Sequence, residues 1–195
     1  MGTWTAFYVE AGVEETIAAC SDWLGAKAHK NVLQNRGGFP ARRRFYLRGD
    51  APRRLVVGAA SATWAEVHVD GFYSPNPAAI AVSQALQTRV INTIAQTTSD
   101  SYELTIYERG EQRRQLAFEE FAWTAQEGKA LAGEPMPLAT KDEDEEDLED
   151  FGCDEIRTYC QQVFGFEFWM DPAGRAWCEL SPEKRGLLSW LRRKP

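Results

Sequence analysis

The sequence predicts an α+β protein with a largely antiparallel sheet, two or three packed helices and a C-terminal α-β-β extension. Three observations lead to this fold class. Segments with the two-residue alternation of strands outnumber amphipathic helical segments. Short turn sequences, such as TSD at 98–100 and RGE at 109–111, join successive strands as hairpins do. The 195 residues are 44% hydrophobic and include seven Trp, which is enough apolar material for one core.

The first half of the chain alternates between strand and helix patterns. Apolar side chains recur at helical spacing from Val13 to Leu24, and Gly25 is a suitable stop. A proline near the start of the second helical segment fits its first turn. The predicted elements are, in order, a strand at 3–11, a helix at 13–26, a loop at 30–41, strands at 43–49, 54–60 and 63–72, and a helix at 74–88.

The second half begins with a predicted meander and ends with a separate extension. Tyr102, Leu104 and Ile106 alternate with polar or amphipathic neighbours, as in a half-buried strand. The predicted elements are strands at 89–98, 101–110 and 113–123, a connector at 124–141, a helix at 148–164, a hairpin at 166–180 and a basic tail. We therefore expect a core over 1–123, a linker with an acidic run over 124–147, and a C-terminal helix and hairpin over 148–195 packed on the same core.

The composition predicts a soluble cytoplasmic protein without a cofactor. The first residues lack a basic region followed by an apolar run, and no apolar stretch is long enough to span a bilayer. The four cysteines are widely scattered, which favours reduced thiols over a disulfide framework. His29 and His68 have no second ligand at metal spacing, so we expect no metal site.

The acidity of the chain is concentrated in one short run. Net charge is −7, from 22 basic and 29 acidic residues. Removing the eight acids of the run leaves 22 against 21, which is nearly neutral. The acidic run consists of Asp142, Glu143, Asp144, Glu145, Glu146, Asp147, Glu149 and Asp150. Such a local excess favours docking to a basic partner or internal charge pairing.

Several structures are compatible with the acidic run. A calcium loop that starts at Asp142 needs Gly at its sixth position and Glu at its twelfth, but these hold Asp147 and Cys153. Acids at a helix start complement its dipole, and an amphipathic helical pattern follows directly. Two or three acids would suffice for that role. The excess leaves a solvated run or recognition of a basic protein surface, which such charge would accelerate.

Two other groups of residues are candidates for binding or chemistry. Arg42, Arg43 and Arg44 form a candidate anion-binding cluster, although the overall charge disfavours nucleic acid as the ligand. His68 shares a strand face with Glu66 and Asp70, which could orient its imidazole. The alternation in this strand nevertheless favours an exposed polar face. The sequence contains no G-x-S-x-G, Walker A, G-x-G-x-x-G or H-E-x-x-H motif, so we expect no catalytic residues.

The stretch at 64–116, from WAEVHVDGF to SDSYELTIYERGEQRRQL, resembles small bacterial proteins that include immunity proteins encoded beside secreted or polymorphic toxins. The likeness covers a strand–helix–strand–strand pattern and brings no site residues with it. It implies a cytoplasmic, non-enzymatic protein that binds a toxin, here through the acidic run. One alternative is a small enzyme or ligand-binding domain that uses His68, Glu66 and Asp70 or the arginine cluster. Another alternative is a regulatory adaptor with the acidic run as a tether.

Overall fold

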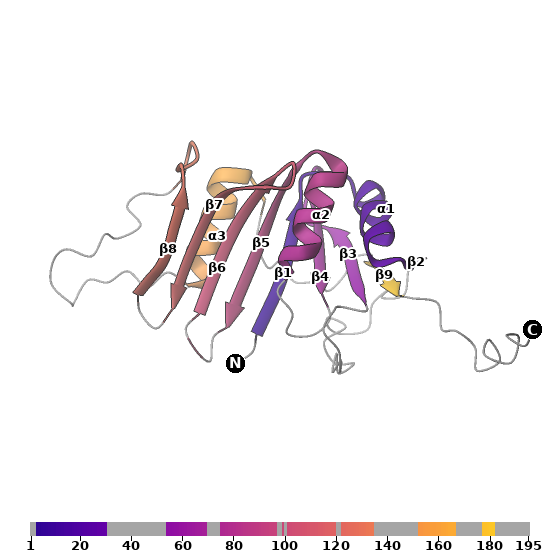
Figure 1. Cartoon of the computed structure of the whole chain (residues 1–195), viewed down its shortest axis with the longest axis horizontal. Coiled ribbons are helices and arrows are strands. Elements are labelled where there is room, and N and C mark those ends of the chain that lie inside the picture. Colours follow the sequence, from indigo (N-terminus) through magenta and orange to yellow (C-terminus); the bar gives the residue numbers. More distant parts are fainter. Residues whose placement is uncertain are drawn as a thin grey trace, which may run out of the picture.

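The computed structural model describes residues 3–30, 54–69, 75–96, 99, 101–119, 122–134, 152–166 and 177–181, and all structural statements below concern these residues. They form three helices and one nine-stranded sheet in the order β2-β9-β3-β4-β1-β5-β6-β7-β8 (Figure 1). Every strand pair is antiparallel. The predicted α+β class with a largely antiparallel sheet is therefore confirmed.

The strands are β1 (Thr3–Val9), β2 (Lys27–Lys30), β3 (Leu55–Ala59), β4 (Ala65–Val69), β5 (Arg89–Gln96), β6 (Ser101–Glu108), β7 (Glu111–Glu119), β8 (Ala122–Gly128) and β9 (Trp177–Ser181). The helices are α1 (Val13–Leu24), α2 (Asn76–Leu86) and α3 (Cys153–Phe164).

The outer helices α1 and α3 begin in the same way. The Gly12 amide donates a hydrogen bond of 3.1 Å to the Glu15 carboxylate, and the Gly152 amide donates one of 2.8 Å to Glu155. In each case a carboxylate satisfies a backbone donor at the positive end of the helix dipole. Helix α1 ends at Gly25, whose φ of 63° is left-handed and suits glycine.

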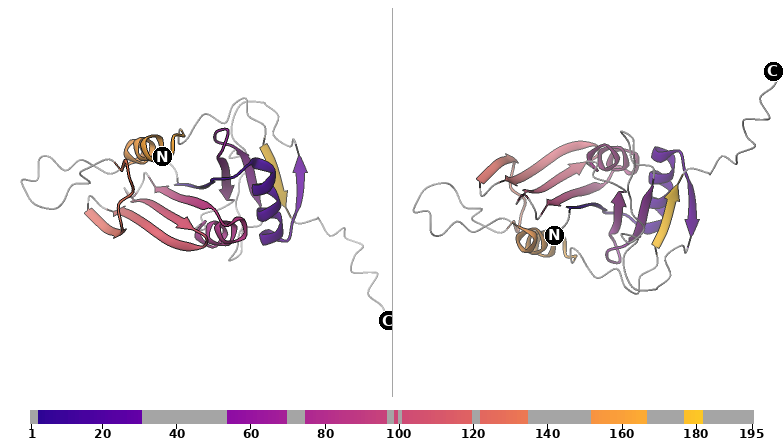
Figure 2. Two further views of the ribbon diagram at one scale, coloured as in Figure 1. Left: turned by 90° about the horizontal axis from the view of Figure 1, so that it is seen from above. Right: turned by 90° about the horizontal axis from the view of Figure 1, so that it is seen from below.

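The helices cover opposite faces of the sheet (Figure 2). Helices α1 and α2 pack on one face, here called the helix-pair face, over β1, β3, β4, β9 and parts of β5 and β6. Helix α3 packs on the other face, the α3 face, over β1, β5, β6 and β7. Because side chains alternate along a strand, β1 supplies Phe7 and Val9 to one core cluster and Ala6 and Tyr8 to the other. Strand β1 is thus buried on both sides.

The prediction for 113–123 and the connector was wrong in its boundaries. The single predicted strand is two strands, because β7 ends at Glu119 and β8 starts at Ala122. Strand β8 continues to Gly128, so the predicted core boundary at residue 123 falls within a strand. Backbone pairing with β7 holds this segment, in which side chains give little alternation. A prediction from hydrophobic periodicity therefore assigns this segment to a connector.

The predicted C-terminal hairpin was also wrong. Strand β9 lies between β2 and β3, with Leu180 opposite both Ala28 and Leu55. Both edges of β9 are therefore taken by strands that are distant in the sequence. Strand β2 was not predicted. The predicted strand at 43–49 lies outside the described residues, as do the first residues of the helix predicted at 148–164.

Candidate functional site

The predicted site residues fall into two groups. The acidic run at 142–150, the arginines at 42–44 and Asp70 lie outside the described residues. Glu66 and His68 are described, and both lie on β4. The structure thus describes two of the three residues of the histidine hypothesis. Elsewhere it presents a buried ion pair, an acidic sheet face and a polar pocket.

Glu66 and His68 belong to a buried polar cluster on the α3 face. Tyr8 on β1 donates a hydrogen bond of 3.0 Å to Glu66 Oε1, and His68 Nε2 lies 2.8 Å from the same oxygen. The exposed fractions of Tyr8, Glu66 and His68 are 0%, 2% and 5%. The ring of Trp177 on β9 meets the imidazole edge-on, with ring centroids 5.4 Å apart.

The prediction that this polar side of the strand is exposed was therefore wrong. Strand β4 lies inside the sheet, between β1 and β3, and all five of its residues are buried. The polar alternation reflects a hydrogen-bonded network within the protein. Glu66 accepts from the tyrosine and holds the imidazole, so the cluster orients His68 in the protein interior.

Two of the described thiols are not activated as nucleophiles. Cys20 and Cys160 lie in the two hydrophobic clusters, on α1 and α3. Burial raises the pKa of Cys20 to about 12 and also raises the pKa of Cys160. Both thiols are therefore protonated at neutral pH, whereas the thiolate is the reactive form. In the described ranges, no group of three His, Cys, Asp or Glu side chains is arranged to hold a metal ion.

A buried ion pair, which the sequence patterns did not indicate, joins β7 to the segment after β8. Arg114 Nη2 lies 2.6 Å from Glu134 Oε1, and the exposed fractions of the two side chains are 7% and 1%. Arg114 Nη1 also donates to the carbonyls of Glu127 and Gly128, at 3.1 Å each. Glu134 lies in the predicted connector, where no periodicity marked it for burial.

Glu134 also connects this ion pair to α3. The Tyr159 hydroxyl donates to Glu134 Oε2 at 3.0 Å, and the Leu131 amide donates to the same oxygen at 2.9 Å. Burial raises the pKa of Glu134, but the hydrogen bonds from Arg114, Leu131 and Tyr159 outweigh it, so this pKa lies below its ordinary value. Burial and the neighbouring carboxylate raise the pKa of Tyr159. The network is a structural tie between the sheet and α3.

The helix-pair face is acidic beyond α2, and no described helix lies over it at β7 and β8 (Figure 2). Leu104 and Leu116 point to the α3 face, so their strand neighbours point the other way. Cross-strand pairing places three carboxylates on this side, one on each of three strands. We call Glu103 on β6, Glu119 on β7 and Glu127 on β8 the open acidic face.

Neutral donors hold these carboxylates. Thr105 donates to Glu103 at 2.6 Å, and Gln112 donates to Glu127 at 3.2 Å. Glu119 receives a longer bond of 3.5 Å from Ser101. Within the described part of the chain, none of the three forms an ion pair with Lys or Arg. Among the described residues, the negative charge of the open acidic face is therefore not compensated.

Between this face and α2 lies a group of neutral polar side chains. Tyr107 on β6 donates a hydrogen bond of 3.0 Å to Asn76 Oδ1 at the start of α2. Burial and the charge of Glu103 raise the pKa of Tyr107 to about 12. Asn92 on β5 is fully buried beside them and donates to the same Asn76 oxygen at 2.5 Å. Within the described ranges, its own Oδ1 has no hydrogen-bond partner.

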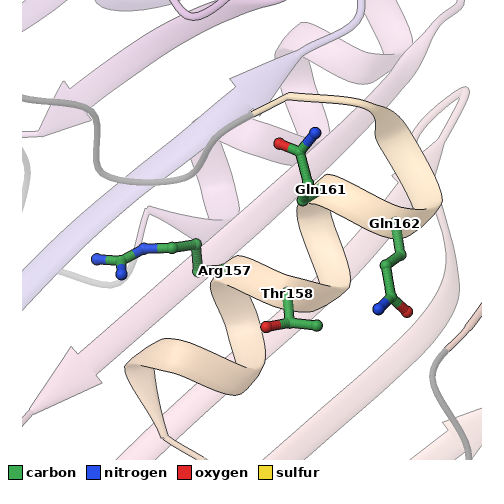
Figure 3. Close-up of a pocket in the computed structure, with 4 residues that line it drawn as sticks. All are labelled: Arg157, Thr158, Gln161 and Gln162. Carbon is green, nitrogen blue, oxygen red and sulfur yellow. The ribbon is translucent and has the colours of Figure 1, made fainter.

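A pocket of about 360 Å³ lies on the outer side of α3 (Figure 3). The described side chains that line it are Arg157, Thr158, Gln161 and Gln162, and all four are exposed. Arg157 is paired with Asp154 one turn earlier, at 3.1 Å. The lining offers hydrogen-bonding groups from one helix, but none of these four side chains is a general base, which the Thr158 hydroxyl would need in order to act as a nucleophile.

The fold and these sites define an α+β protein with an acidic, partly open sheet. Compared with protein-family models, with curated proteins and with solved structures, the chain gives no match. None of the described helices combines the length and the apolar character that crossing a membrane requires.

Proposed function

We propose that this chain is a non-enzymatic protein that binds a partner with a basic surface. The observation that carries the proposal is the acidic run, in which eight of the nine residues from Asp142 to Asp150 are carboxylates. The rest of the chain is nearly neutral. Local charge of one sign steers an oppositely charged partner and raises its association rate.

The open acidic face supports this proposal from the described part of the fold. Its three carboxylates lack cationic partners among the described residues, and two of them are exposed. If the fold relied on surface ion pairs at this face, Lys or Arg side chains would lie beside these three carboxylates. A basic partner surface would supply that missing positive charge. The acidic run and the open acidic face thus favour the same class of partner.

In its most specific form, the proposal is a bacterial immunity protein that neutralises a cognate toxin acting in the cytoplasm. The resemblance of residues 64–116 to such proteins motivates this form. An inhibitor of this kind covers a toxin surface and needs no chemistry of its own. A highly acidic segment would suit a toxin whose active surface is basic, such as one that acts on nucleic acid.

The arrangement of the described residues gives less support to the enzyme alternative. His68 and Glu66 are buried and bonded to each other, although a catalytic base must reach its substrate. Cys20 and Cys160 are buried with raised pKa values. The adaptor alternative depends on the acidic run alone, and no described contact favours it.

The test uses the full chain and the products of its neighbouring genes, with association rates measured against ionic strength. In the neutralised variant, Asp142→Asn, Asp144→Asn, Glu146→Gln and Glu149→Gln remove four charges at constant size. We expect its association at low salt to slow by about tenfold or more, with a smaller change in dissociation. The difference should shrink near physiological salt, where screening acts over about 8 Å.

The matched control exchanges Asp and Glu throughout the acidic run, which keeps all eight charges but alters every side-chain length. This control should associate as fast as the wild-type chain if charge is what matters. Equal rates for the wild-type and neutralised chains at low salt would contradict the proposal. The immunity form is tested separately. The wild-type chain should protect cells from a toxin encoded by a neighbouring gene, and the neutralised variant should lose this protection.

A further inference from the structure

We draw no further inference here: the strongest candidate, the buried Tyr8–Glu66–His68 cluster on the α3 face of β1 and β4, consists of side chains bonded to one another and packed against Trp177 and Phe166, and nothing in the described part of the chain points to a ligand there.

Discussion

On β1 and β4, the buried side chains of Tyr8 and His68 both form hydrogen bonds to the carboxylate of Glu66. On β6, β7 and β8, the carboxylates of the open acidic face accept hydrogen bonds from neutral donors alone among the described residues. The first group lies on strands that are buried on both faces, whereas no described helix covers the helix-pair face of β7 and β8 in the second group. The same alternation of polar and apolar residues thus produces an internal network in one region and an accessible charged surface in the other.

The comparison implies different responses to substitution. A buried polar group whose hydrogen-bond partner is removed still carries the cost of its desolvation. Removing such a partner therefore lowers the free energy of unfolding strongly. Neutralising an exposed carboxylate that forms no ion pair changes the free energy of unfolding little. The following predictions test this difference, starting with the largest expected effect.

The largest effect is expected for the ion pair between Arg114 and Glu134. Glu134→Leu leaves the guanidinium buried without its counter-charge and also removes the acceptor of the Tyr159 hydroxyl. We expect the free energy of unfolding to fall by about 3–5 kcal/mol, measured by urea denaturation. Glu127→Gln on the open acidic face is the control and should change stability by less than about 0.5 kcal/mol. Equal losses in the two variants would contradict the proposed contrast.

The next effect concerns the packing of β3 against β9. A Cβ added at Gly58 would lie 2.5 Å from the ring of Trp177, which is closer than van der Waals contact. We expect Gly58→Ala to lower the free energy of unfolding by about 1–3 kcal/mol, because the ring must shift in a packed interior. Ala117→Val adds volume on the half-buried side of β7 and should cost less. Thermal unfolding of both variants provides the measurement, and an unchanged melting temperature for Gly58→Ala would refute the close approach.

A smaller loss is expected in the buried cluster. Tyr8→Phe removes one hydroxyl and one hydrogen bond to Glu66 while the ring continues to pack on Phe166. The free energy of unfolding should fall by about 1–2 kcal/mol. His68→Ala should cost at least as much, because it also removes the ring that meets Trp177. If the cluster were an exposed polar face, as the sequence pattern suggested, both substitutions would leave stability almost unchanged.

The ion pair also makes stability depend on pH. The folded pKa of Glu134 lies below its ordinary value of 4.5, so ionised Glu134 stabilises the folded state above that pH. This contribution is lost as the pH falls from the unfolded pKa through the lower folded pKa. The stability difference between the wild-type chain and Glu134→Gln should therefore be constant above about pH 6 and narrow below about pH 4.5. Denaturation of both proteins between pH 3 and 7 measures it, and a gap that widens toward low pH would reverse the assigned sign.

The smallest effect on stability is expected on the open acidic face. Replacing Glu103, Glu119 and Glu127 together with Gln keeps their shape and hydrogen-bonding oxygens but removes three like charges. We expect a change of at most about 0.5 kcal/mol, with a slight gain if repulsion dominates. A loss of several kcal/mol would show that these carboxylates support the fold in the same way as the buried cluster does.

Elements with strong local patterns were the ones that the sequence predicted well. Strand β1, helices α1 and α2, and strands β3 to β6 all appear close to their predicted positions. Each combines hydrophobic periodicity with turn or cap residues, so neighbouring residues carry the information. The sequence did not predict strand β8, because its stability depends on pairing with β7. It did not predict β2 either, because this strand is short and pairs with the distant β9.

The candidate sites show the same limit. The sequence located the acidic run and singled out Glu66 and His68, since residue type and spacing are visible in one dimension. It did not show that these two side chains are buried, nor that Glu134 would meet Arg114 and Tyr159. Partners 20 and 25 residues away, on separate elements, complete that network.

The sequence by itself determined the fold class, most of the local elements and the place where negative charge is concentrated, because periodicity and composition act over a few neighbouring residues. Only the tertiary structure decided the position of β9 between β2 and β3 and the assignment of helices to opposite faces. It also decided which polar strand face is internal and which is open. These features depend on contacts between distant segments. Polar side chains of the same kind form a hydrogen-bonded network where these contacts bury them and a charged surface where they remain exposed.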